Sequence, residues 1–149
     1  MVTVFLVYGA SVELFRIIIG GKMIIGIGID AVELERFRES LERYGERIKN
    51  RLFTKHEQEY CDRFSSPLEH YAVRFAAKEA FMKAIGTGKT NQVYWCDVEI
   101  VNEPSGKPIL AIKGAAAGIT AGLGASRLHV SLSHSRTIAA AVVVIENET

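Results

Sequence analysis

The order of apolar and polar positions predicts a chain that begins with a strand and continues into a helix. Residues 23–29 are rich in isoleucine, and Gly26 and Gly28 among them allow another backbone to approach closely. The stretch AVELERFRESLERYG, residues 31–45, has apolar positions at mostly helical spacing, and Gly45 is expected to end that helix. We therefore expect a glycine-containing strand followed by an amphipathic helix.

Local signals mark two further helices. Thr54, with Glu57 three positions later, is typical of a capping box that opens the helix KHEQEYCDRF. Pro67 suits the first turn of the next helix, which is alanine-rich, covers residues 68–85 and stops at the turn Gly86-Thr87-Gly88. The remaining pattern predicts a strand near 94–101, a turn, a short strand, a helix over 114–124 and two closing strands, RLHVSLSH and TIAAAVVVIE. Strands before and after a helical middle predict an α+β fold in a single domain.

The first 22 residues have the features of neither a membrane span nor a signal peptide. Glu13 and Arg16 interrupt their apolar runs, which stay below the roughly 18–20 residues that cross a bilayer. No basic segment or small-x-small cleavage site accompanies them. They could form an extra strand or an amphipathic helix. We favour Met23 as the natural start, because Gly20-Gly21-Lys22-Met23 can be encoded by a purine-rich run that looks like a bacterial ribosome-binding site. Residues 1–22 are then an N-terminal extension, and 23–149 form the functional domain.

Composition narrows the classes of function. The chain has 149 residues, 48% of them hydrophobic, and a net charge of +1, which fits one domain and argues against a general nucleic-acid-binding protein. Cys61 and Cys96 are isolated thiols without C-x-x-C spacing, so they indicate neither a disulfide framework nor a zinc site. Because both cysteines are expected to be small, reduced side chains, we expect a cytoplasmic protein.

Glu79 is the most unusual position of the long helix. Phe75, Glu79 and Met82 stand at i, i+4 and i+7, so the carboxylate shares a stripe with two large apolar residues. Burial of a carboxylate is costly unless the group finds a cation, a metal or a proton. Spacing alone slightly favours an ion pair with Lys83, which would contribute only about 0.2–0.5 kcal/mol.

Basic residues surround Glu79 on the same helix. Arg74 and Lys78 are four residues apart, and like charges at this spacing are mildly destabilising. An anion held near Arg74, Lys78 and Lys83, together with a metal, would compensate, and a solvated basic face is an equally good interpretation. The turn that begins at Gly86 adds backbone N–H groups that a phosphate can approach, although this pattern alone is weak evidence.

Asp30, at the predicted end of the first strand, also allows two interpretations. Aspartate is a favourable N-cap for a helix that begins near Val32. A carboxylate at a strand end is equally suited to a hard cation, and proteins usually hold Mg²⁺ with one or two carboxylates and substrate phosphates. Asp30 and Glu79 would form such a pair if the strand packs on the long helix.

His134 follows a clear alternating pattern. In HVSLSHS, Val130 and Leu132 share one face of a strand, and His134 falls at its end. A single histidine in a turn is usually structural or solvated, and the pattern does not decide its role.

Three segments together resemble one family. GIGIDAVELERF, RFAAKEAFMKAIGTG and HVSLSHSRTIAAAVVVIE are similar, in order and spacing, to the signature stretches of the bacterial holo-[acyl-carrier-protein] synthases, the short class of 4′-phosphopantetheinyl transferases. The similarity covers Met23 to Glu146. One departure is Val73, where the family often has glycine. The resemblance implies a 4′-phosphopantetheinyl transferase-like fold, in which a small antiparallel sheet packs against a long helix.

The resemblance also implies an activity. The family transfers the 4′-phosphopantetheine arm from coenzyme A to a serine of apo-acyl-carrier protein in fatty acid biosynthesis, with Mg²⁺, and releases adenosine 3′,5′-bisphosphate. By motif position, Asp30 and Glu79 match the Mg²⁺ ligands, and Lys83 matches the lysine near the pyrophosphate. Glu79 and a Mg²⁺-bound water both remain candidates for the general base that activates the serine.

Further residues come from the same motifs. Arg74, Lys78 and Gly86 are expected near the phosphates of coenzyme A, and His134 matches the histidine at the coenzyme A site. Family members are typically homotrimers with active sites between subunits, so His134 would then reach the site of a neighbouring subunit.

The predicted first helix has a composition suited to an acidic partner. Between Arg43 and Lys55 there are five basic residues and one acidic residue, and Arg36 lies earlier on the same helix. Acyl-carrier proteins are strongly acidic, so we expect Arg36, Arg43 and Arg47 to steer and orient them. A merely solvated face is the alternative, since the helix also carries several glutamates.

Without the resemblance, two other classes would fit the residues. One is a small metal-dependent hydrolase of phosphate esters that uses Asp30 and Glu79. The other is a non-enzymatic module whose basic helix binds an acidic partner, and such a module should be indifferent to Mg²⁺.

Overall fold

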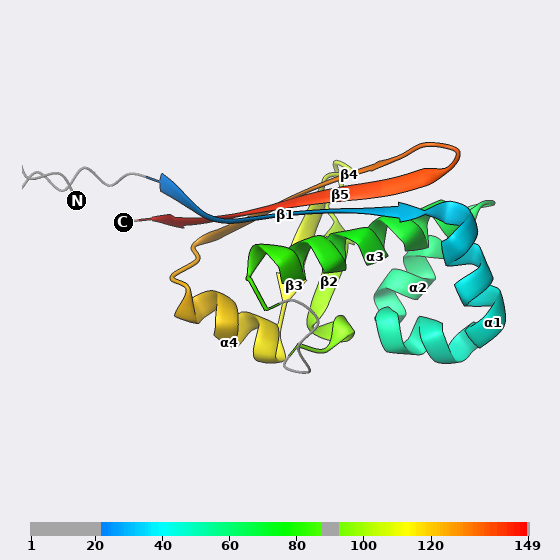
Figure 1. Cartoon of the computed structure of the whole chain (residues 1–149), viewed down its shortest axis with the longest axis horizontal. Helices are drawn as coiled ribbons and strands as arrows, with labels where there is room; N and C mark the ends of the chain where they lie inside the picture. The colour runs from blue at the N-terminus through cyan, green and yellow to red at the C-terminus, as the bar shows by residue number, and fades with distance from the viewer. Residues whose placement is uncertain (1–21, 88–92, 149) are drawn as a thin grey trace, which may run out of the picture.

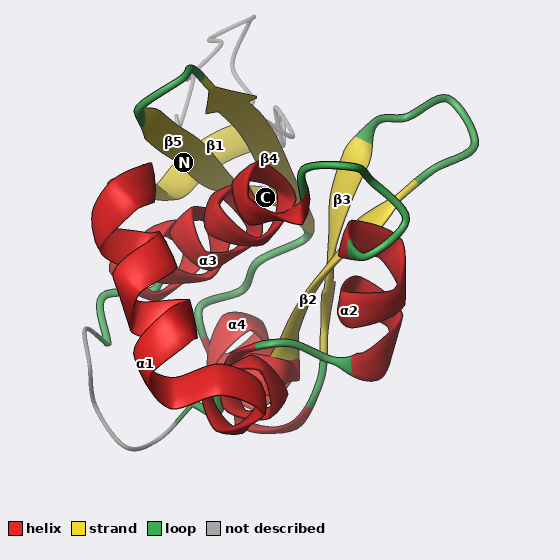
Figure 2. Cartoon of the chain, turned by 90° about the vertical axis from the view of Figure 1, so that its right-hand side faces the viewer, coloured by secondary structure: helices red, strands yellow, loops and turns green. Residues whose placement is uncertain are grey.

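The computed structural model of the chain describes residues 22–87 and 93–148 (Figure 1). A three-stranded antiparallel sheet has the order β1-β5-β4, in which β1 is Lys22–Glu33, β5 is Ile138–Glu148 and β4 is Arg127–His134. A separate antiparallel pair consists of β2, Val98–Asn102, and β3, Pro108–Ile112. Figure 2 shows this pair beside α2.

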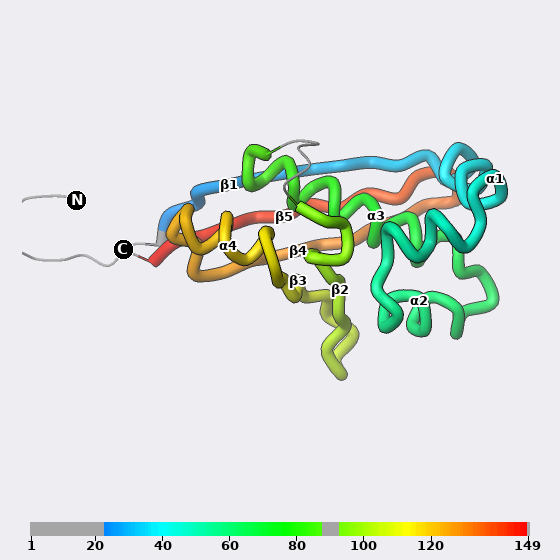
Figure 3. The backbone as a smooth tube through the Cα atoms, turned by 90° about the horizontal axis from the view of Figure 1, so that it is seen from below, coloured from blue at the N-terminus to red at the C-terminus, as the bar shows by residue number. Residues whose placement is uncertain are grey.

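The helices surround the long central helix α3, Pro67–Ala84. The others are α1, Leu34–Leu52; α2, Lys55–Cys61; α4, Gly114–Gly122; and the short 3₁₀ helix η1, Trp95–Asp97. α3 packs against β1, β5 and β4. α1 and α2 lie at one end of the sheet and α4 at the other (Figures 1 and 3). The expected α+β fold, with a small antiparallel sheet on a long helix, is confirmed.

The sheet buries one face and leaves the other open. On β5 the buried side chains alternate with half-buried ones and face α3; they are Ala139, Ala141, Val143 and Ile145. On the opposite face, Ile27 and Ile29 of β1 are 61% and 65% exposed, and they stand opposite Val144 and Val142 in the register. Because neighbouring residues of a strand point to opposite faces, this outer face presents apolar side chains to solvent.

The two glycines of β1 determine how closely α3 packs. A Cβ atom on Gly28 would overlap the carbonyl oxygen of Ala80, and one on Gly26 would overlap that of Ala84. The strand therefore touches the helix backbone directly, as the glycines in the sequence predicted.

Several local predictions are confirmed. Thr54 accepts a hydrogen bond from the Glu57 N–H, and the Glu57 carboxylate accepts one from the Thr54 N–H, which completes the capping box of α2. Pro67 occupies the first turn of α3. Cys61 and Cys96 are both free.

Two element boundaries were predicted incorrectly, and the one at Gly45 is confirmed as a kink. β1 does not end near Asp30 but continues to Glu33, because its last residues pair with the first residues of β5. The prediction that Gly45 interrupts the helix is confirmed, because its φ of 51° and ψ of −138° are not helical; α1 consists of two helical segments that meet at this kink, and the second continues to Leu52. The strand expected near 94–101 begins only at Val98, since Trp95–Asp97 forms η1.

Among residues 22–87 and 93–148, no helix is long and apolar enough to cross a membrane. β1 begins at Lys22, one residue before Met23. The proposal that residues 1–22 are an extension stays a prediction, because residues 1–21 lie outside the described part of the chain.

Candidate active site

Asp30 lies inside β1, on the face that meets α3. It shares that face with Gly26 and Gly28, since alternate residues of a strand point the same way, and the register with β5 is continuous from Gly26 to Asp30. The alternative that Asp30 caps the following helix is wrong, because Glu33 is the N-cap of α1. The contact of the glycines with α3 thus brings the Asp30 carboxylate to the long helix.

Lys83 connects the two elements. Its Nζ lies 2.8 Å from Asp30 Oδ1 and donates a second hydrogen bond, of 2.9 Å, to the Ile29 carbonyl oxygen. The Lys83 side chain is 50% exposed and that of Asp30 17% exposed, so this ion pair opens to solvent. Spacing had suggested an ion pair between Lys83 and Glu79, which stays a prediction; the structure adds the ion pair between Lys83 and Asp30.

Glu79 lies one helical turn before Lys83 and is half-buried on α3. The Asp30 carboxylate and the Lys83 ammonium group therefore meet where β1 crosses α3, and Glu79 stands one helical turn away from Lys83 on the same helix. Within the described residues no group of three or more His, Cys, Asp or Glu side chains forms a metal cluster. A pair of carboxylates is the protein contribution that Mg²⁺ commonly receives when phosphates supply further oxygens.

Lys78 does not face solvent, so the interpretation that it belongs to a solvated basic face is wrong. Its side chain is fully buried, and its Nζ lies 2.7 Å from Glu57 Oε2. The same nitrogen donates to the carbonyl oxygens of Leu52 and Trp95, at 2.7 and 3.1 Å. Burial lowers the pKa of Lys78, although the neighbouring Glu57 carboxylate partly opposes this. With all three ammonium donors occupied by protein oxygens, the geometry argues against the expected contact with coenzyme A phosphates.

Arg74 is also buried, at 2% exposure, and does not belong to a solvated face either. Its guanidinium donates to Asn102 Oδ1 at 2.6 Å and to the His70 carbonyl oxygen at 3.2 Å, and it lies over the Tyr60 ring. The Arg74 Nε is buried without a hydrogen-bond partner. Its expected role at the coenzyme A phosphates stays a prediction.

Gly86 lies in the turn after α3 with a φ of 73°, a conformation that favours glycine. Its N–H donates to the Lys83 carbonyl oxygen at 3.1 Å. Gly86 is exposed beside the open end of α3, and its contact with coenzyme A stays a prediction, while Gly88 lies outside the described residues.

His134 is the exposed last residue of β4. Its ring meets that of His70 of α3 edge-on, with 6.3 Å between ring centroids, and His70 in turn stacks on Phe64 at 3.6 Å. Burial, together with the charges of Arg74 and His134, lowers the pKa of His70, while Glu69 opposes this shift. This aromatic stack was not predicted, because no local sequence pattern connects Phe64 and His70 with His134 of β4.

The three predicted partner-binding arginines are all exposed on α1. Arg36 lies in the first turns, and Arg43 and Arg47 lie on either side of the kink at Gly45. Beyond the kink, a pocket of about 330 Å³ combines an apolar floor with two guanidinium groups; it is lined by Tyr44, Arg47, Ile48 and Arg51. Such a surface can receive a partner that carries both acidic and apolar side chains.

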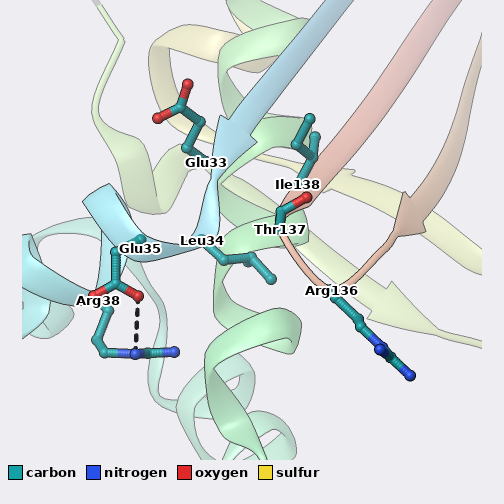
Figure 4. Close-up of a pocket in the computed structure, with 7 residues that line it drawn as sticks. All are labelled: Glu33, Leu34, Glu35, Arg38, Arg136, Thr137 and Ile138. Carbon is teal, nitrogen blue, oxygen red and sulfur yellow. Dashed lines mark ion pairs between the residues drawn. The ribbon is translucent and has the colours of Figure 1, made fainter.

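A second pocket, of about 360 Å³, lies where β1 passes into α1 (Figure 4). Glu35 and Arg38 form an ion pair of 2.9 Å on its wall, and the Arg136 side chain extends away from them. Glu33 adds a further carboxylate. The acidic and basic groups that line this pocket are equal in number, so the charge of the pocket does not by itself favour an acidic partner.

Sequence reasoning missed Glu57 as a partner of Lys78. The capping box gave a signal for Glu57, but it pointed only to the start of α2. Nothing in the sequence connects Glu57 with a lysine 21 residues further along the chain.

Comparison with known proteins identifies the family of the chain. The profile of the 4′-phosphopantetheinyl transferase superfamily matches residues 26–143. A holo-[acyl-carrier-protein] synthase from Koribacter versatilis is 46% identical over 125 residues, which are 84% of this chain and all of the relative.

Solved structures give the same result. The holo-[acyl-carrier-protein] synthase of Neisseria meningitidis superposes with a TM-score of 0.78 at 34% identity and covers 84% of this chain and all of that one. The enzyme of Bacillus anthracis in complex with coenzyme A (3′,5′-ADP) has a TM-score of 0.70 at 37% identity, over 84% of this chain and 98% of that one. The resemblance seen in the three sequence motifs is thereby confirmed, and the chain belongs to the 4′-phosphopantetheinyl transferase superfamily.

Proposed function

We propose that this protein transfers 4′-phosphopantetheine from coenzyme A to a serine of apo-acyl-carrier protein, in fatty acid biosynthesis, and releases adenosine 3′,5′-bisphosphate. The observation that carries the proposal is the ion pair between Asp30 and Lys83 where β1 crosses α3, one helical turn from Glu79, in a chain of this superfamily. The names of relatives over nearly their whole length support the choice of both substrates.

Asp30 and Glu79 are the residues that we propose to hold Mg²⁺. Their carboxylate oxygens are hard donors of the kind that this ion prefers, and Asp30 already accepts a cationic group, the Lys83 ammonium. When bound, Mg²⁺ supplies positive charge to the pyrophosphate on which negative charge develops during transfer.

The remaining roles belong to side chains of the chain itself. The half-exposed Lys83 offers its ammonium group to the departing phosphate, where charge stabilisation in a preorganised site lowers the barrier. Glu79 is our candidate for the group that takes the proton of the carrier serine. Arg74, Gly86 and His134 are proposed to bind coenzyme A, and the open position of His134 at the end of β4 allows such a contact.

We propose that the active enzyme is a homotrimer. The outer face of the sheet supports this, because Ile27, Ile29 and the half-buried Val142 and Val144 form an apolar surface that a second copy of the chain would cover. His134 would then complete the site of a neighbouring subunit.

Docking of the carrier protein is assigned to α1. Arg36, Arg43 and Arg47 are exposed on this helix, and the pocket next to Arg47 offers an apolar contact between charged groups. An acidic carrier would be oriented by the arginines and held by the pocket. We place the reaction in the cytoplasm, where the free thiols Cys61 and Cys96 would stay reduced.

Incubation with apo-acyl-carrier protein, coenzyme A and Mg²⁺ tests the proposed reaction. We expect the carrier to gain about 340 Da, the mass of the arm, and the gain to disappear when the metal is chelated. Release of adenosine 3′,5′-bisphosphate without carrier protein would instead indicate a hydrolase. A carrier mass that stays unchanged across a range of carriers and metal concentrations would refute the proposal.

A further inference from the structure

A sealed polar cluster lies on the side of α3 away from the open ion pair. Its centre is the ion pair between Lys78 and Glu57, whose side chains are both fully buried. Lys78 Nζ also donates to the carbonyl oxygen of Leu52, the last residue of α1, and to that of Trp95 in η1. One ammonium group thus joins α3 to three other elements.

The Glu57 carboxylate extends the cluster further. Its Oε2 accepts the N–H of Thr54 at 2.9 Å, and its Oε1 accepts the N–H of Ile100 in β2 at 3.1 Å. Five hydrogen bonds therefore hold this cluster: one joins Lys78 to Glu57, and four connect the pair to backbone groups. All of these bonds are directional, so the cluster fits one arrangement of the surrounding elements.

The position of the cluster connects it to the proposed site. Lys78 immediately precedes Glu79, and successive residues of an α-helix are related by a fixed rotation and rise. Holding Lys78 in place therefore restricts the rotation of α3 and, with it, the direction in which Glu79 leaves the helix. The bond to Leu52 fixes the carboxyl end of α1, the helix that carries Arg43 and Arg47.

Stability alone is a poor reason for such a pair. Removing two charges from water offsets most of their attraction, and a packed apolar pair of similar volume often stabilises a protein equally well. What an apolar pair lacks is the set of directional bonds that fixes α1 and α3 relative to each other.

We propose that Lys78 and Glu57 are positioning residues, which hold the carrier-docking helix α1 and the metal-site helix α3 in the orientation that transfer requires. The inference rests on the proposed function. It assigns to Lys78 a role inside the protein in place of a contact with coenzyme A.

Glu57→Gln tests the proposal with a small change of shape. The amide keeps an oxygen acceptor but loses the charge that holds Lys78. We expect kcat/KM for the carrier protein to fall about 10- to 100-fold, because small misplacements of docked substrates have effects of this size. The KM for coenzyme A should stay within about twofold of the original value, since Lys78 is proposed to make no contact with it.

Glu99→Gln is the matched control. Glu99 lies on β2 and its Oε1 contacts His56 and Thr54, but its side chain is 23% exposed, and its charge acts on Lys78 at a distance, without a hydrogen bond. This variant should leave both kinetic constants unchanged. An equal loss in Glu99→Gln and Glu57→Gln would overturn the proposal, because any carboxylate near α2 would then have the same effect.

The double variant Lys78→Met/Glu57→Gln distinguishes a positioning role of the pair from a stabilising role. It removes both buried charges, so its melting temperature should exceed that of Lys78→Met, which leaves Glu57 uncompensated. We expect the double variant to fold and still to show the loss in kcat/KM for the carrier. Recovery of full activity, unchanged kinetics in folded Glu57→Gln, or failure of both variants to fold would each overturn the positioning role. If instead the original protein does not modify any carrier, the proposed function itself has failed.

Discussion

Lys78 and Lys83 lie five residues apart on α3 and form ion pairs of nearly equal length, yet their surroundings differ completely. Lys78 is fully buried against Glu57, and protein oxygens occupy all three of its donors. Lys83 is half-exposed and reaches Asp30 across the contact between α3 and β1. One helix therefore carries a sealed charge on one side and an accessible charge on the other.

The difference shows why ion-pair length says little about function. A buried pair whose hydrogen bonds are complete has no capacity for a ligand, and it acts on the reaction only through the elements it joins. An open pair can exchange its partners for a metal ion or a phosphate. We therefore distinguish the two sides of α3 as a structural side and a chemical side, and the following changes test that distinction.

The largest effect is expected on the open side. Asp30→Ala or Glu79→Ala should lower turnover about 10²–10⁴-fold, because each removes an oxygen donor from the proposed Mg²⁺ site. The free energy of unfolding should change by less than about 1 kcal/mol for Asp30→Ala, since its ion partner is half-exposed. Turnover measured against Mg²⁺ concentration, with urea unfolding alongside, checks both statements.

Glu33→Ala is the control for that pair of variants. Glu33 is exposed on the same strand and makes no side-chain capping bond, so its removal should leave turnover nearly unchanged. Near-normal activity of Glu79→Ala would contradict the assignment of the metal ligands.

The two lysines themselves provide the next test. Lys78→Met should lower the free energy of unfolding by about 3–5 kcal/mol, because it leaves the Glu57 carboxylate buried without its cation. Lys83→Met should lower it by less than about 1 kcal/mol, because the pair it breaks is open to water. Urea unfolding of both variants measures the difference, and similar losses would show that the two sides of α3 are not distinct.

A smaller loss is expected at the contact that brings the open side together. Gly28→Ala places a Cβ atom against the Ala80 carbonyl oxygen, so β1 and α3 must separate, at a cost of about 1–3 kcal/mol. Gly118→Ala in α4 meets no atom within 4 Å and should stabilise the helix by about 0.5–1 kcal/mol. Thermal unfolding compares the two substitutions, and a neutral Gly28→Ala would refute the close contact.

The smallest effect concerns pH. The folded protein lowers the pKa of His70 from its ordinary value of 6.5, chiefly through burial, so below that pH the unfolded chain binds more protons than the folded one. Stability should therefore fall as the pH decreases through 6.5, by less than about 1.4 kcal/mol per pH unit for this partly exposed ring. His70→Phe keeps the stacking on Phe64, and its melting temperature should depend less on pH between 5 and about 7. Identical pH profiles would contradict this account.

Local signals predicted the elements whose causes are local. Thr54 with Glu57, Pro67, and the alternation before His134 each specify structure within a few residues, and each matches the fold. Boundaries failed where distant partners decide them. β1 extends past Asp30 because β5 pairs with its last residues, from more than 100 positions further along the chain.

In the candidate site, too, the sequence predicted what has local causes and missed what depends on distant partners. The residue types and the family resemblance pointed to Asp30, Glu79 and Lys83, but the contact of Lys83 with Asp30 depends on two elements 53 residues apart. Lys78 was expected to be accessible, either on a solvated face or beside the phosphates of coenzyme A, because nothing near it in the sequence reveals Glu57 and Trp95 as its partners. Spacing along one helix shows which side chains share a face, but not what that face meets.

The kink at Gly45 has a consequence for redesign of the enzyme. Gly45 has a positive φ and open space around its Cα, so it sets the angle between the two halves of α1 without contacting any partner. Replacing it with a residue that restores regular helical geometry would swing Arg47 relative to Arg43 without changing any arginine of the sequence. Variation at this one position therefore offers a library of docking angles, from which variants with a preference for other carrier proteins can be selected.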